Sequence, residues 1–477
     1  MKAMILTFVI VLLASVAPAA GQDLASAEKR ARELVSMINL GDRSRFEDYV
    51  KNNFEGQFRD LPMEQHLRFY SSVYDSSRGY DVTGVRSLEG DLITLNVKSK
   101  LTGEPGGIAV RIEDKEPYRI TGIGLRAALP EQDPKKMSDA EIAREMEAFM
   151  KKLSDADVFS GTVLLAKDGK PVYKGAFGVA NRDFDVPNKF DTKFNLGSMN
   201  KMFTSIAIAK LIEQGKVSLE DPLSKFLPDF PDAESAKKIQ VKHLLSHTAG
   251  LGGYFSERWD QRSRGSIRTV DDMIALAKED ESLRFEPGTN WRYSNTGMLV
   301  LGKIIEVSSG ENYFDFVRKN VLEPAGMENT GCFELDKVNK NLAVGYEKEF
   351  TDSGVEFRNN IFAHVMRGGP QGGCYSTAED LLKFSTALQA GKIVGKDLVD
   401  QFTTAKPELS SPNYGFGFQA PPDGSRFGHG GGFLGISANM DVFRGTGWTA
   451  IVLSNYGGAG QTVGSKMARI VASQTAQ

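Results

Sequence analysis

The 477-residue sequence contains only two cysteines, Cys332 and Cys374, and no C-x-x-C pair. This scarcity excludes a disulfide-stapled scaffold and a cysteine-rich zinc site. One bond between the two cysteines is compatible with the sequence, but their separation along the chain cannot establish it. An excess of charge of one sign is also lacking, since 58 Lys and Arg face 61 Asp and Glu for a net charge of -3. The sequence therefore gives no electrostatic reason to expect nucleic acid or an anionic membrane as a partner.

Long apolar runs are lacking too, because no segment of the sequence reaches the roughly 20 residues that a membrane-spanning helix requires. Residues 1–21 combine Lys2, a short apolar run over 5–14 and the small-residue end Ala17-Pro18-Ala19-Ala20-Gly21. This pattern predicts a secretory signal peptide. An uncleaved anchor is the alternative, and the shortness of the run opposes it. The mature protein is therefore expected to be periplasmic or secreted, without an integral membrane segment.

The composition is that of an ordinary globular protein, since 41% hydrophobic and 25% charged residues exclude wholesale disorder. At about 150 residues a domain, the length predicts two or three domains. Helical spacing of apolar residues, and then strand-like alternation, mark the segments 27–38, 45–52, 62–76, 93–97 and 108–112. Residues 24–126 are therefore predicted to form a small α+β domain of unknown role. Its single histidine, His66, is interpreted as a surface or capping residue.

Residues 127–137 are predicted to be a linker, because they hold two prolines among scattered charges. Residues 138–477 are predicted to form one larger domain. Turn residues between apolar runs predict two hairpins, at 161–166 with 171–179 and at 435–443 with 448–454, and a closing helix at 461–473. Because the hairpins lie at opposite ends of a mainly helical region, an antiparallel sheet built from distant parts of the chain is expected.

A serine and a lysine three residues apart, Ser198 and Lys201, open a long apolar helix. This spacing places both side chains on one helical face. Burial lowers the pKa of a lysine and frees its amine to accept a proton, which is what a serine hydroxyl needs to become a nucleophile. A helix cap with an incidental lysine explains the same four residues, so the pair requires support from elsewhere in the chain.

Two later motifs supply that support. The turn Pro287-Gly288 leads into Tyr293-x-Asn295, where a tyrosine beside a lysine can act as general base and acid. The Asn295 amide can bond both Lys201 and a substrate carbonyl. Farther on, the run Gly428-His429-Gly430-Gly431-Gly432 precedes an apolar strand. Glycines there allow a substrate to approach the backbone and receive its N–H groups.

In this order, the three motifs resemble those of the serine β-lactamase and penicillin-binding-protein superfamily, in its class C, esterase and D-aminopeptidase-like branch. The resemblance covers residues 150–475 and includes the connecting stretches Leu-Leu-Ser-His-Thr-Ala-Gly-Leu at 244–251 and Cys-Tyr-Ser-Thr-Ala-Glu-Asp-Leu at 374–381. It implies an α+β fold, in which a β-lactamase-like domain of antiparallel sheet, flanking helices and an all-helical region follows the small amino-terminal domain.

The resemblance also implies catalytic roles. Ser198 resembles the family nucleophile, Lys201 its activating lysine and Tyr293 the motif tyrosine. The expected activity is that of an exported serine hydrolase, which cleaves a small ester, amide or peptide through an acyl-enzyme without metal or organic cofactor. An S-x-x-K nucleophile also fits the absence of G-x-S-x-G around any serine, which argues against an α/β-hydrolase.

The remaining site residues are assigned to substrate binding. Asn295 resembles the motif asparagine, and Gly431 and Gly432 lie where the family's substrate-binding strand begins, with the Ser198 and Gly432 N–H groups as the oxyanion hole. His429 departs from the lysine of the Lys-Thr-Gly motif. An unperturbed histidine is mostly neutral at pH 7, so it holds a substrate carboxylate less well than an ammonium does. This departure favours esters or amides over penicillins and carboxyl-terminal peptides.

Alternative interpretations remain open at this point. One is a penicillin-recognising DD-carboxypeptidase or β-lactamase, and another is a non-catalytic binding protein on the same scaffold. His243 and His247 have the spacing of zinc ligands on a helix, but the glutamate of H-E-x-x-H is missing, so structural roles are favoured. The aromatic residues Tyr254, Phe255 and Trp259 are expected either to line an acyl pocket or to anchor a long loop.

Overall fold

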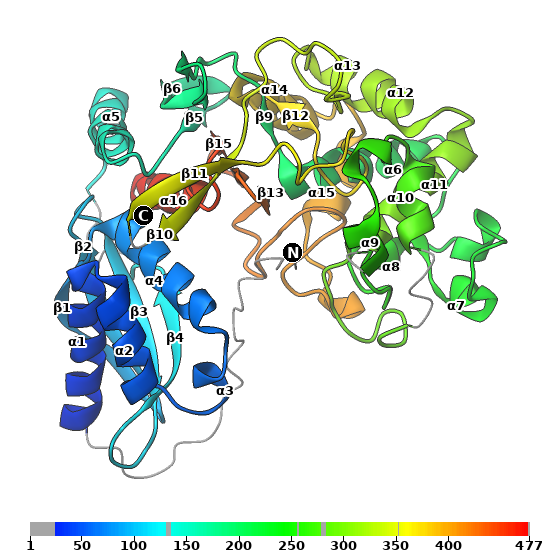
Figure 1. Cartoon of the computed structure of the whole chain (residues 1–477). Helices are drawn as coiled ribbons and strands as arrows, with labels where there is room; N and C mark the ends of the chain where they lie inside the picture. The colour runs from blue at the N-terminus through cyan, green and yellow to red at the C-terminus, as the bar shows by residue number, and fades with distance from the viewer. Residues whose placement is uncertain (1–23, 130–134, 255–256, 278–282, 352, 476–477) are drawn as a thin grey trace.

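The computed structural model describes residues 24–129, 135–254, 257–277, 283–351 and 353–475. The predicted signal peptide, residues 1–21, lies outside these residues, as does the middle of the predicted linker. Figure 1 shows a smaller amino-terminal unit, coloured blue to cyan, packed against a larger unit that continues to the carboxyl terminus. None of the helices among the described residues is long and apolar enough to cross a bilayer.

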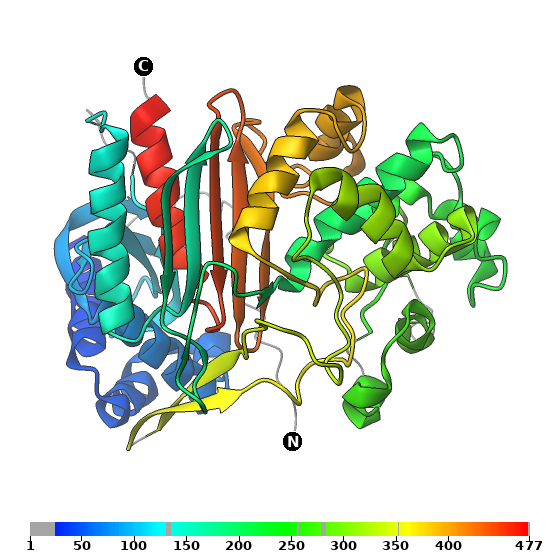
Figure 2. The same ribbon diagram turned by 90° about the horizontal axis from the view of Figure 1, so that it is seen from above.

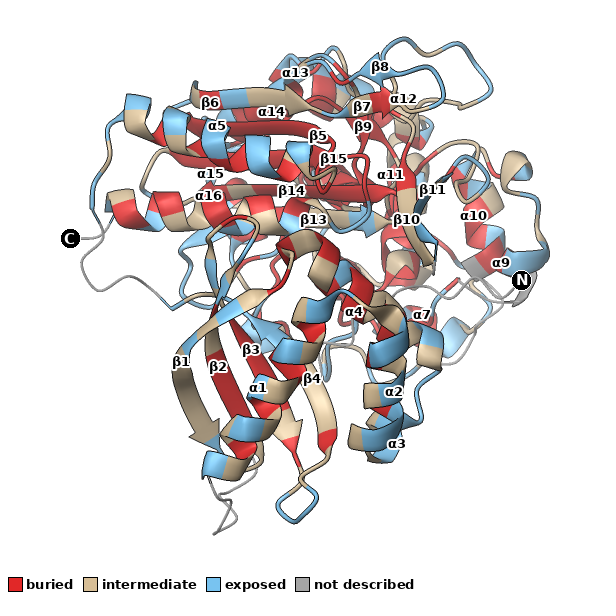
Figure 3. Ribbon diagram, turned by 60° about the vertical axis from the view of Figure 1, so that its left-hand side comes forward, coloured by how far each residue is buried: buried red, intermediate tan, exposed pale blue. Residues whose placement is uncertain are grey.

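The smaller unit places four helices on one face of a four-stranded antiparallel sheet of strand order β1-β2-β3-β4 (Figures 1 and 3). Its helices are α1 (Leu24–Leu40), α2 (Arg43–Asn53), α3 (Gly56–Arg59) and α4 (Met63–Ser77), and its strands are β1 (Tyr80–Glu89), β2 (Leu92–Ser99), β3 (Pro105–Ile112) and β4 (Ile120–Arg126). Alternate residues of β2 and β3 are fully buried against the helices, as the strand periodicity predicts. The unit therefore has a hydrophobic core of its own.

His66 belongs to that core, so its prediction as a surface residue is wrong, although its ring also bonds the backbone of Phe58 and Arg59 at the end of α3, as a capping residue does. Its side chain is buried, and its ring packs edge-on against Phe54 at 5.4 Å and Phe58 at 5.1 Å between ring centroids. His66 lies four and seven residues before Tyr70 and Val73 on the apolar face of α4, both of which are buried. The helical period of α4, more than the residue type, determined its position.

The larger unit begins where Ser138 caps α5. The Ser138 hydroxyl accepts the backbone N–H of Glu141, and the Glu141 carboxylate accepts the N–H of Ser138, a reciprocal capping box. The helices of the unit are α5 (Asp139–Asp155), α6 (Lys201–Glu213), α7 (Ala233–Lys238), α8 (Val241–Leu245), α9 (Glu257–Gln261), α10 (Val270–Ala277), α11 (Asn295–Ser309), α12 (Tyr313–Val317), α13 (Glu323–Ala325), α14 (Ala378–Gln389), α15 (Lys396–Thr403) and α16 (Gly460–Thr475). Its strands are β5 (Gly161–Lys167), β6 (Lys170–Phe177), β7 (Val179–Asn181), β8 (Val186–Pro187), β9 (Phe194–Asn195), β10 (Tyr346–Thr351), β11 (Gly354–Asn359), β12 (Tyr375–Ser376), β13 (Arg426–Phe433), β14 (Ile436–Phe443) and β15 (Trp448–Ser454).

Five of these strands form the antiparallel sheet expected from the two hairpins, in the order β13-β14-β15-β5-β6. Strand β15 pairs with β5, so that Ile451 lies opposite Leu164 although the two residues are far apart in the chain. Figure 2 shows α5 (teal) and α16 (red) on one side of the sheet, with α14 (gold) and the other helices of the larger unit on the opposite side. Val163 packs in the first layer and Leu164 in the second, which explains why β5 is almost continuously apolar.

Three ion pairs among the described residues join the units. Lys348 on β10 lies 2.6 Å from Asp75 on α4, and both side chains are largely buried. Lys466 on α16 lies 2.9 Å from Glu104, in the turn between β2 and β3, and Arg469 of the same helix pairs with the same carboxylate. Because an unpaired buried charge costs several kcal/mol in principle, these contacts tie the small unit to the outer helix layer and to the β10–β11 hairpin.

Candidate active site

The predicted nucleophile lies in the short 3₁₀ turn Gly197–Asn200 that leads directly into α6. Lys201 is the first residue of α6, and its Nζ donates a 3.0 Å hydrogen bond to Ser198 Oγ. The three-residue spacing therefore brings the two side chains into direct contact, as the sequence predicts.

Lys201 is completely buried, and this burial lowers its pKa well below the usual range for lysine. Its Nζ also donates to the backbone carbonyl of Gln371 and lies 4.9 Å from the ring centroid of Tyr293. Among the described residues no hydrogen bond joins Lys201 to Asn295, the partner expected from the sequence; the Gln371 carbonyl is its second acceptor.

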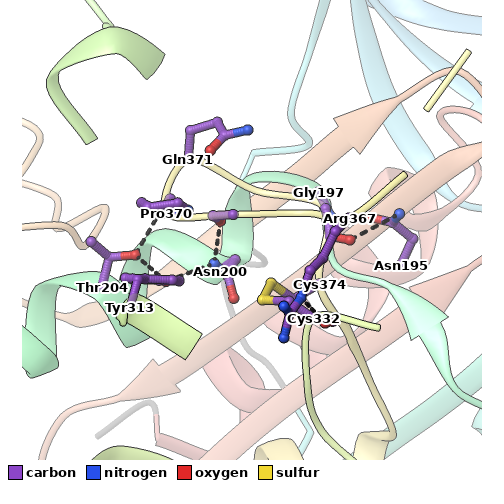
Figure 4. The surroundings of a disulfide bond; sticks show 12 residues. Asn195, Gly197, Asn200, Thr204, Tyr313, Cys332, Arg367, Pro370, Gln371 and Cys374 are labelled. Atoms are coloured by element: carbon purple, nitrogen blue, oxygen red, sulfur yellow. Dashed lines mark hydrogen bonds between the residues drawn. A yellow bond between two sulfur atoms is a disulfide. The ribbon is translucent and has the colours of Figure 1, made fainter. Parts of the chain in front are cut away.

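The segment that carries the Gln371 carbonyl is held next to the serine by backbone contacts. The N–H of Gly373 donates to the Gly197 carbonyl at 3.2 Å, and the N–H of Leu196 donates to the Cys374 carbonyl at 2.8 Å. Cys374 forms a disulfide bond with Cys332 (Figure 4). The pairing that the sequence left open therefore exists and anchors the chain three residues after Gln371.

A buried polar cluster supports the other end of this segment, as Figure 4 shows. Asn200 donates to the Gly369 carbonyl at 2.7 Å, and Thr204 donates to the Pro370 carbonyl at 2.7 Å. The Tyr313 hydroxyl lies within hydrogen-bonding distance of both side chains. Residues 369–374 are thus fixed at both ends, which holds the Gln371 carbonyl against Lys201.

The glycines of β13 lie directly against the serine turn. A Cβ atom on Gly431 would stand 1.9 Å from the Leu196 carbonyl oxygen and 3.2 Å from the Ser198 nitrogen. A Cβ atom on Gly197, whose φ is +49°, would stand 3.0 Å from the Gly432 nitrogen. Only a glycine strand allows this approach, and it brings the backbone nitrogens of Ser198 and Gly432 into one neighbourhood, as an oxyanion hole requires.

Tyr293 reaches the same place from the loop before α11. Burial raises the pKa of its phenol above the usual value, while a hydrogen bond with Ser198 acts in the opposite direction. Asn295 is the first residue of α11 and is half-buried. The fold therefore brings Ser198, Lys201 and Tyr293 together. Asn295 follows Tyr293 by two residues in the sequence.

His429 lies on β13 beside these groups, and both of its ring nitrogens form hydrogen bonds within the protein. Its Nε2 lies 2.9 Å from the Tyr414 hydroxyl, and its Nδ1 lies 2.5 Å from the Gly430 carbonyl. Because a carbonyl only accepts, Nδ1 carries the proton and Nε2 accepts the Tyr414 O–H. Burial and the nearby Lys201 lower the pKa of His429 to about 3. The ring is therefore neutral, and both of its nitrogens are satisfied.

Tyr414 and Gln371 were not identified from the sequence. Tyr414 contributes through a contact with a residue 15 positions away, for which no local pattern exists. Gln371 contributes a backbone carbonyl, so its side-chain type carries no information. The glycines that flank it, Gly368-Gly369 and Gly372-Gly373, are the signal that indicates close backbone contact at this point.

The structure also gives the contacts of the two other histidines and of the aromatic residues. No group of three or more His, Cys, Asp and Glu side chains among the described residues is arranged to hold a metal ion. His243 Nδ1 accepts the Gln240 N–H and His247 Nδ1 accepts the Ser294 N–H, which are structural roles. Tyr254 and Trp259 are buried and pack edge to face at 5.2 Å, as expected for a loop anchor. Tyr254 also hydrogen-bonds Gln371, so it lies beside the catalytic groups as a pocket residue would, and the choice between the two roles stays a prediction. Phe255 lies outside the described residues.

The chain was compared with known proteins. The Beta-lactamase family model matches residues 142–472. Penicillin-binding protein 4* of Bacillus subtilis (strain 168) is 31% identical over 337 residues, which cover 65% of this chain and 71% of that protein. Esterase EstB of Burkholderia gladioli is 27% identical over 320 residues, covering 58% of this chain and 79% of the esterase.

A D-stereospecific amidohydrolase from a Streptomyces species has a similar solved structure, with a TM-score of 0.55 and 26% identity over 70% of this chain and 98% of the amidohydrolase. The family model matches the larger unit, and the fold is the β-lactamase-like one expected from the motifs. The family match spans more than half of the chain and includes the serine turn, the tyrosine loop and the glycine strand. This protein is a member of the Beta-lactamase family of serine hydrolases.

Proposed function

We propose that this protein is an exported serine hydrolase that cleaves ester or amide bonds through an acyl-enzyme on Ser198. The observation that carries the proposal is the 3.0 Å hydrogen bond between Lys201 Nζ and Ser198 Oγ, made by a completely buried lysine. A lysine with a lowered pKa supplies a neutral amine that can take the serine proton.

The chemical steps follow from the groups around the serine. Lys201 accepts the Ser198 proton while Oγ forms a bond to the substrate carbonyl carbon, and the developing oxyanion is bound by the N–H groups of Ser198 and Gly432. Because burial raises the pKa of Tyr293, we assign the phenol the role of proton donor to the leaving alcohol or amine. Lys201 then returns a proton to Tyr293, and the carbonyl–leaving-group bond breaks.

Water then hydrolyses the acyl-enzyme, and the proton transfers of the first half-reaction run in reverse. Water adds to the acyl carbon, its proton passes to Tyr293 or Lys201, and the bond to Ser198 Oγ breaks with return of the serine proton. The products are a carboxylic acid and the free alcohol or amine. This sequence needs no redox partner.

Neutral esters and amides are the favoured substrates. His429 holds no charge, and its two nitrogens are bonded to Tyr414 and Gly430, so it offers a substrate carboxylate neither an ammonium nor a free N–H. The names of two relatives, an esterase and a D-stereospecific amidohydrolase, support the same substrate class.

Export is supported by two independent features. The first 21 residues have the composition of a signal peptide, and the Cys332–Cys374 disulfide is a bond that persists in oxidising compartments. Expression of the full chain in a Gram-negative host, followed by fractionation and amino-terminal sequencing, tests this part. A processed chain in the periplasmic fraction is expected; an unprocessed chain in the cytosol would contradict export.

The activity is tested with p-nitrophenyl butyrate, a fluorophosphonate probe and a labelled penicillin, each applied to the protein and to Ser198→Ala. We expect ester hydrolysis and phosphonate labelling that both vanish in the variant. Hydrolysis retained by Ser198→Ala would refute the assignment of the nucleophile. Stable penicillin labelling without ester turnover would indicate the DD-carboxypeptidase or β-lactamase alternative, and neither labelling nor turnover would indicate a binding protein.

A further inference from the structure

His247 lies at the centre of an aromatic cluster next to the catalytic groups, although no step above uses it. It follows α8, is 1% exposed and has a φ of +63°, a left-handed conformation that costs energy for most residue types. The centroid of its ring lies 4.4 Å from that of Tyr293 and 4.6 Å from that of Tyr414. A buried histidine in this conformation, between two tyrosines, calls for an explanation.

The contacts of His247 bracket Tyr293. Its backbone carbonyl accepts the N–H of Arg292 at 3.0 Å, and its Nδ1 accepts the N–H of Ser294 at 3.3 Å. Both chain neighbours of Tyr293 are therefore bound to one residue, while the ring of that residue packs against the Tyr293 ring. The phenol is fixed from the backbone and from the side chain at once.

The bond to Ser294 determines the protonation state of the ring. A backbone N–H can only donate, so Nδ1 is unprotonated and the proton is on Nε2. Nε2 is buried and has no hydrogen-bond partner among the described residues. Burial lowers the pKa of His247 well below the usual value for histidine, which keeps the ring in this neutral form.

The segment around His247 also binds the two loops that carry the tyrosines. Thr248 and Gly250 accept backbone N–H groups from Gly288 and Arg284 of the Tyr293 loop. On the other side, the Leu245 carbonyl accepts the N–H of Gly417, and the Ser246 carbonyl accepts the Ser411 hydroxyl. Residues 245–250 thus bind both loops, which also meet directly where the Ser410 hydroxyl donates to the Gly288 carbonyl at 3.1 Å.

We propose that His247 is a positioning residue for Tyr293, which holds the phenol in the geometry for proton donation by binding both of its chain neighbours and packing on its ring. The proposal rests on the proposed function, because it assumes that Tyr293 acts in catalysis. It assigns no substrate contact to His247.

Two substitutions of His247 distinguish the effect of losing the Nδ1 acceptor from the effect of the left-handed backbone. Asn and Gly both tolerate a left-handed φ, but only Asn offers an oxygen three bonds from Cα, where Nδ1 stands. We expect His247→Gly to lower kcat for p-nitrophenyl butyrate about 100-fold, the loss typical of a small misplacement of a reacting group, with KM changed less than about threefold. His247→Asn should retain kcat within about tenfold of the wild type.

A double-mutant cycle with Tyr293→Phe gives the second readout. If His247 acts through Tyr293, adding His247→Gly to Tyr293→Phe should lower kcat by less than about threefold more, because coupled residues are not additive. Equal losses for His247→Gly and His247→Asn, or a full additional 100-fold loss in the Tyr293→Phe background, would overturn the proposal.

Folding and the proposed function are controlled separately. Thermal unfolding of each variant shows whether it is folded; if His247→Gly is not, His247→Gln replaces it, because its amide lies beyond the Nδ1 position and should lose activity in the same way. Ser198→Ala is measured beside the double-mutant cycle, to establish that the hydrolysis depends on the serine. Hydrolysis that survives Ser198→Ala would refute the proposed function, whereas serine-dependent hydrolysis that is insensitive to His247→Gly would refute only the role of His247.

Discussion

The hydroxyl of Tyr414 lies 2.9 Å from Nε2 of His429, while Nδ1 of the same ring bonds the Gly430 carbonyl. The residue that replaces the family lysine in this strand is therefore neutral and has no free hydrogen-bonding group. We therefore expect His429 to affect substrate binding through its shape and not through a charge or a free N–H group.

This arrangement predicts poor hydrolysis of substrates that carry a carboxylate next to the scissile bond. We expect a neutral ester to be preferred over its carboxylate analogue at least tenfold in kcat/KM, which corresponds to about 1.4 kcal/mol. His429→Lys should narrow that preference by supplying an ammonium. Rates for the matched pair of esters at two ionic strengths test this, and an unchanged ratio in His429→Lys would show that another group sets the preference.

The buried amine of Lys201 predicts the acid limb of the pH profile. Its pKa is lowered by burial, so the neutral, proton-accepting form exists above that lowered pKa and is lost as the pH falls through it. kcat/KM should therefore rise with pH to a plateau that begins below the ordinary lysine pKa of about 10.4.

Lys201→Arg is the matched control for this profile. A guanidinium keeps its proton at every accessible pH, so the variant should lose at least about 100-fold in kcat/KM and should not recover at high pH. A profile of the wild type without an acid limb, or recovery of the arginine variant in alkali, would contradict the role of the amine.

Adjacent glycines of β13 predict opposite tolerance to alanine. A Cβ atom on Gly431 would stand 1.9 Å from the Leu196 carbonyl, whereas one on Gly432 would meet nothing nearer than 3.9 Å. Gly431→Ala must displace the strand from the serine turn and should cost about 100- to 1000-fold in kcat, as loss of an oxyanion donor does. Gly432→Ala keeps its N–H and should lose less than about tenfold, so steady-state kinetics that rank the two variants the other way would contradict the assigned strand geometry.

The disulfide predicts a redox-dependent stability. Cys332 and Cys374 enclose a loop with a sequence separation of 42 residues, for which the loss of chain entropy in the unfolded state corresponds to about 2–4 kcal/mol. Reduction should lower the urea midpoint and also kcat, because residues 369–374 hold the Gln371 carbonyl against Lys201. The double variant Cys332→Ser/Cys374→Ser should unfold like the reduced protein and should not respond to dithiothreitol. A urea midpoint of the variant equal to that of the oxidised protein would show that the disulfide does not stabilise the fold.

His243 predicts a loss of stability in acid. Burial and the neighbouring Lys242 lower its pKa to about 4, below the ordinary value of about 6.5. Between pH 6.5 and pH 4 the unfolded chain binds a proton on His243 that the folded chain does not bind. The free energy of unfolding is therefore unaffected by His243 above pH 6.5 and falls by about 1.4 kcal/mol for each pH unit from there down to about pH 4. His243→Asn keeps an acceptor for the Gln240 N–H and should show a smaller loss between pH 7 and pH 5 in urea titrations, whereas an identical loss would assign the acid sensitivity to other groups.

Local sequence patterns were sufficient for much of the architecture. Alternation and turn residues predicted the hairpins β5–β6 and β14–β15, because a short turn and a buried strand are properties of neighbouring residues. The contact between Ser198 and Lys201 was predictable for the same reason, since a spacing of three residues along a helical turn places two side chains on one face. The same logic applied to α4 would have placed His66 in the core instead of on the surface.

Contacts between distant segments could not be read in this way. The Gln371 carbonyl that accepts from Lys201 is 170 residues away, and the Ser294 N–H that binds His247 is 47 residues away. Neither bond has a local signature, because each depends on how separate elements pack. The pairing of Cys332 with Cys374 and the hydrogen bond between Tyr414 and His429 belong to this class as well. Residue types and their spacing thus specified which groups could react, whereas burial and long-range packing set their protonation states and their partners.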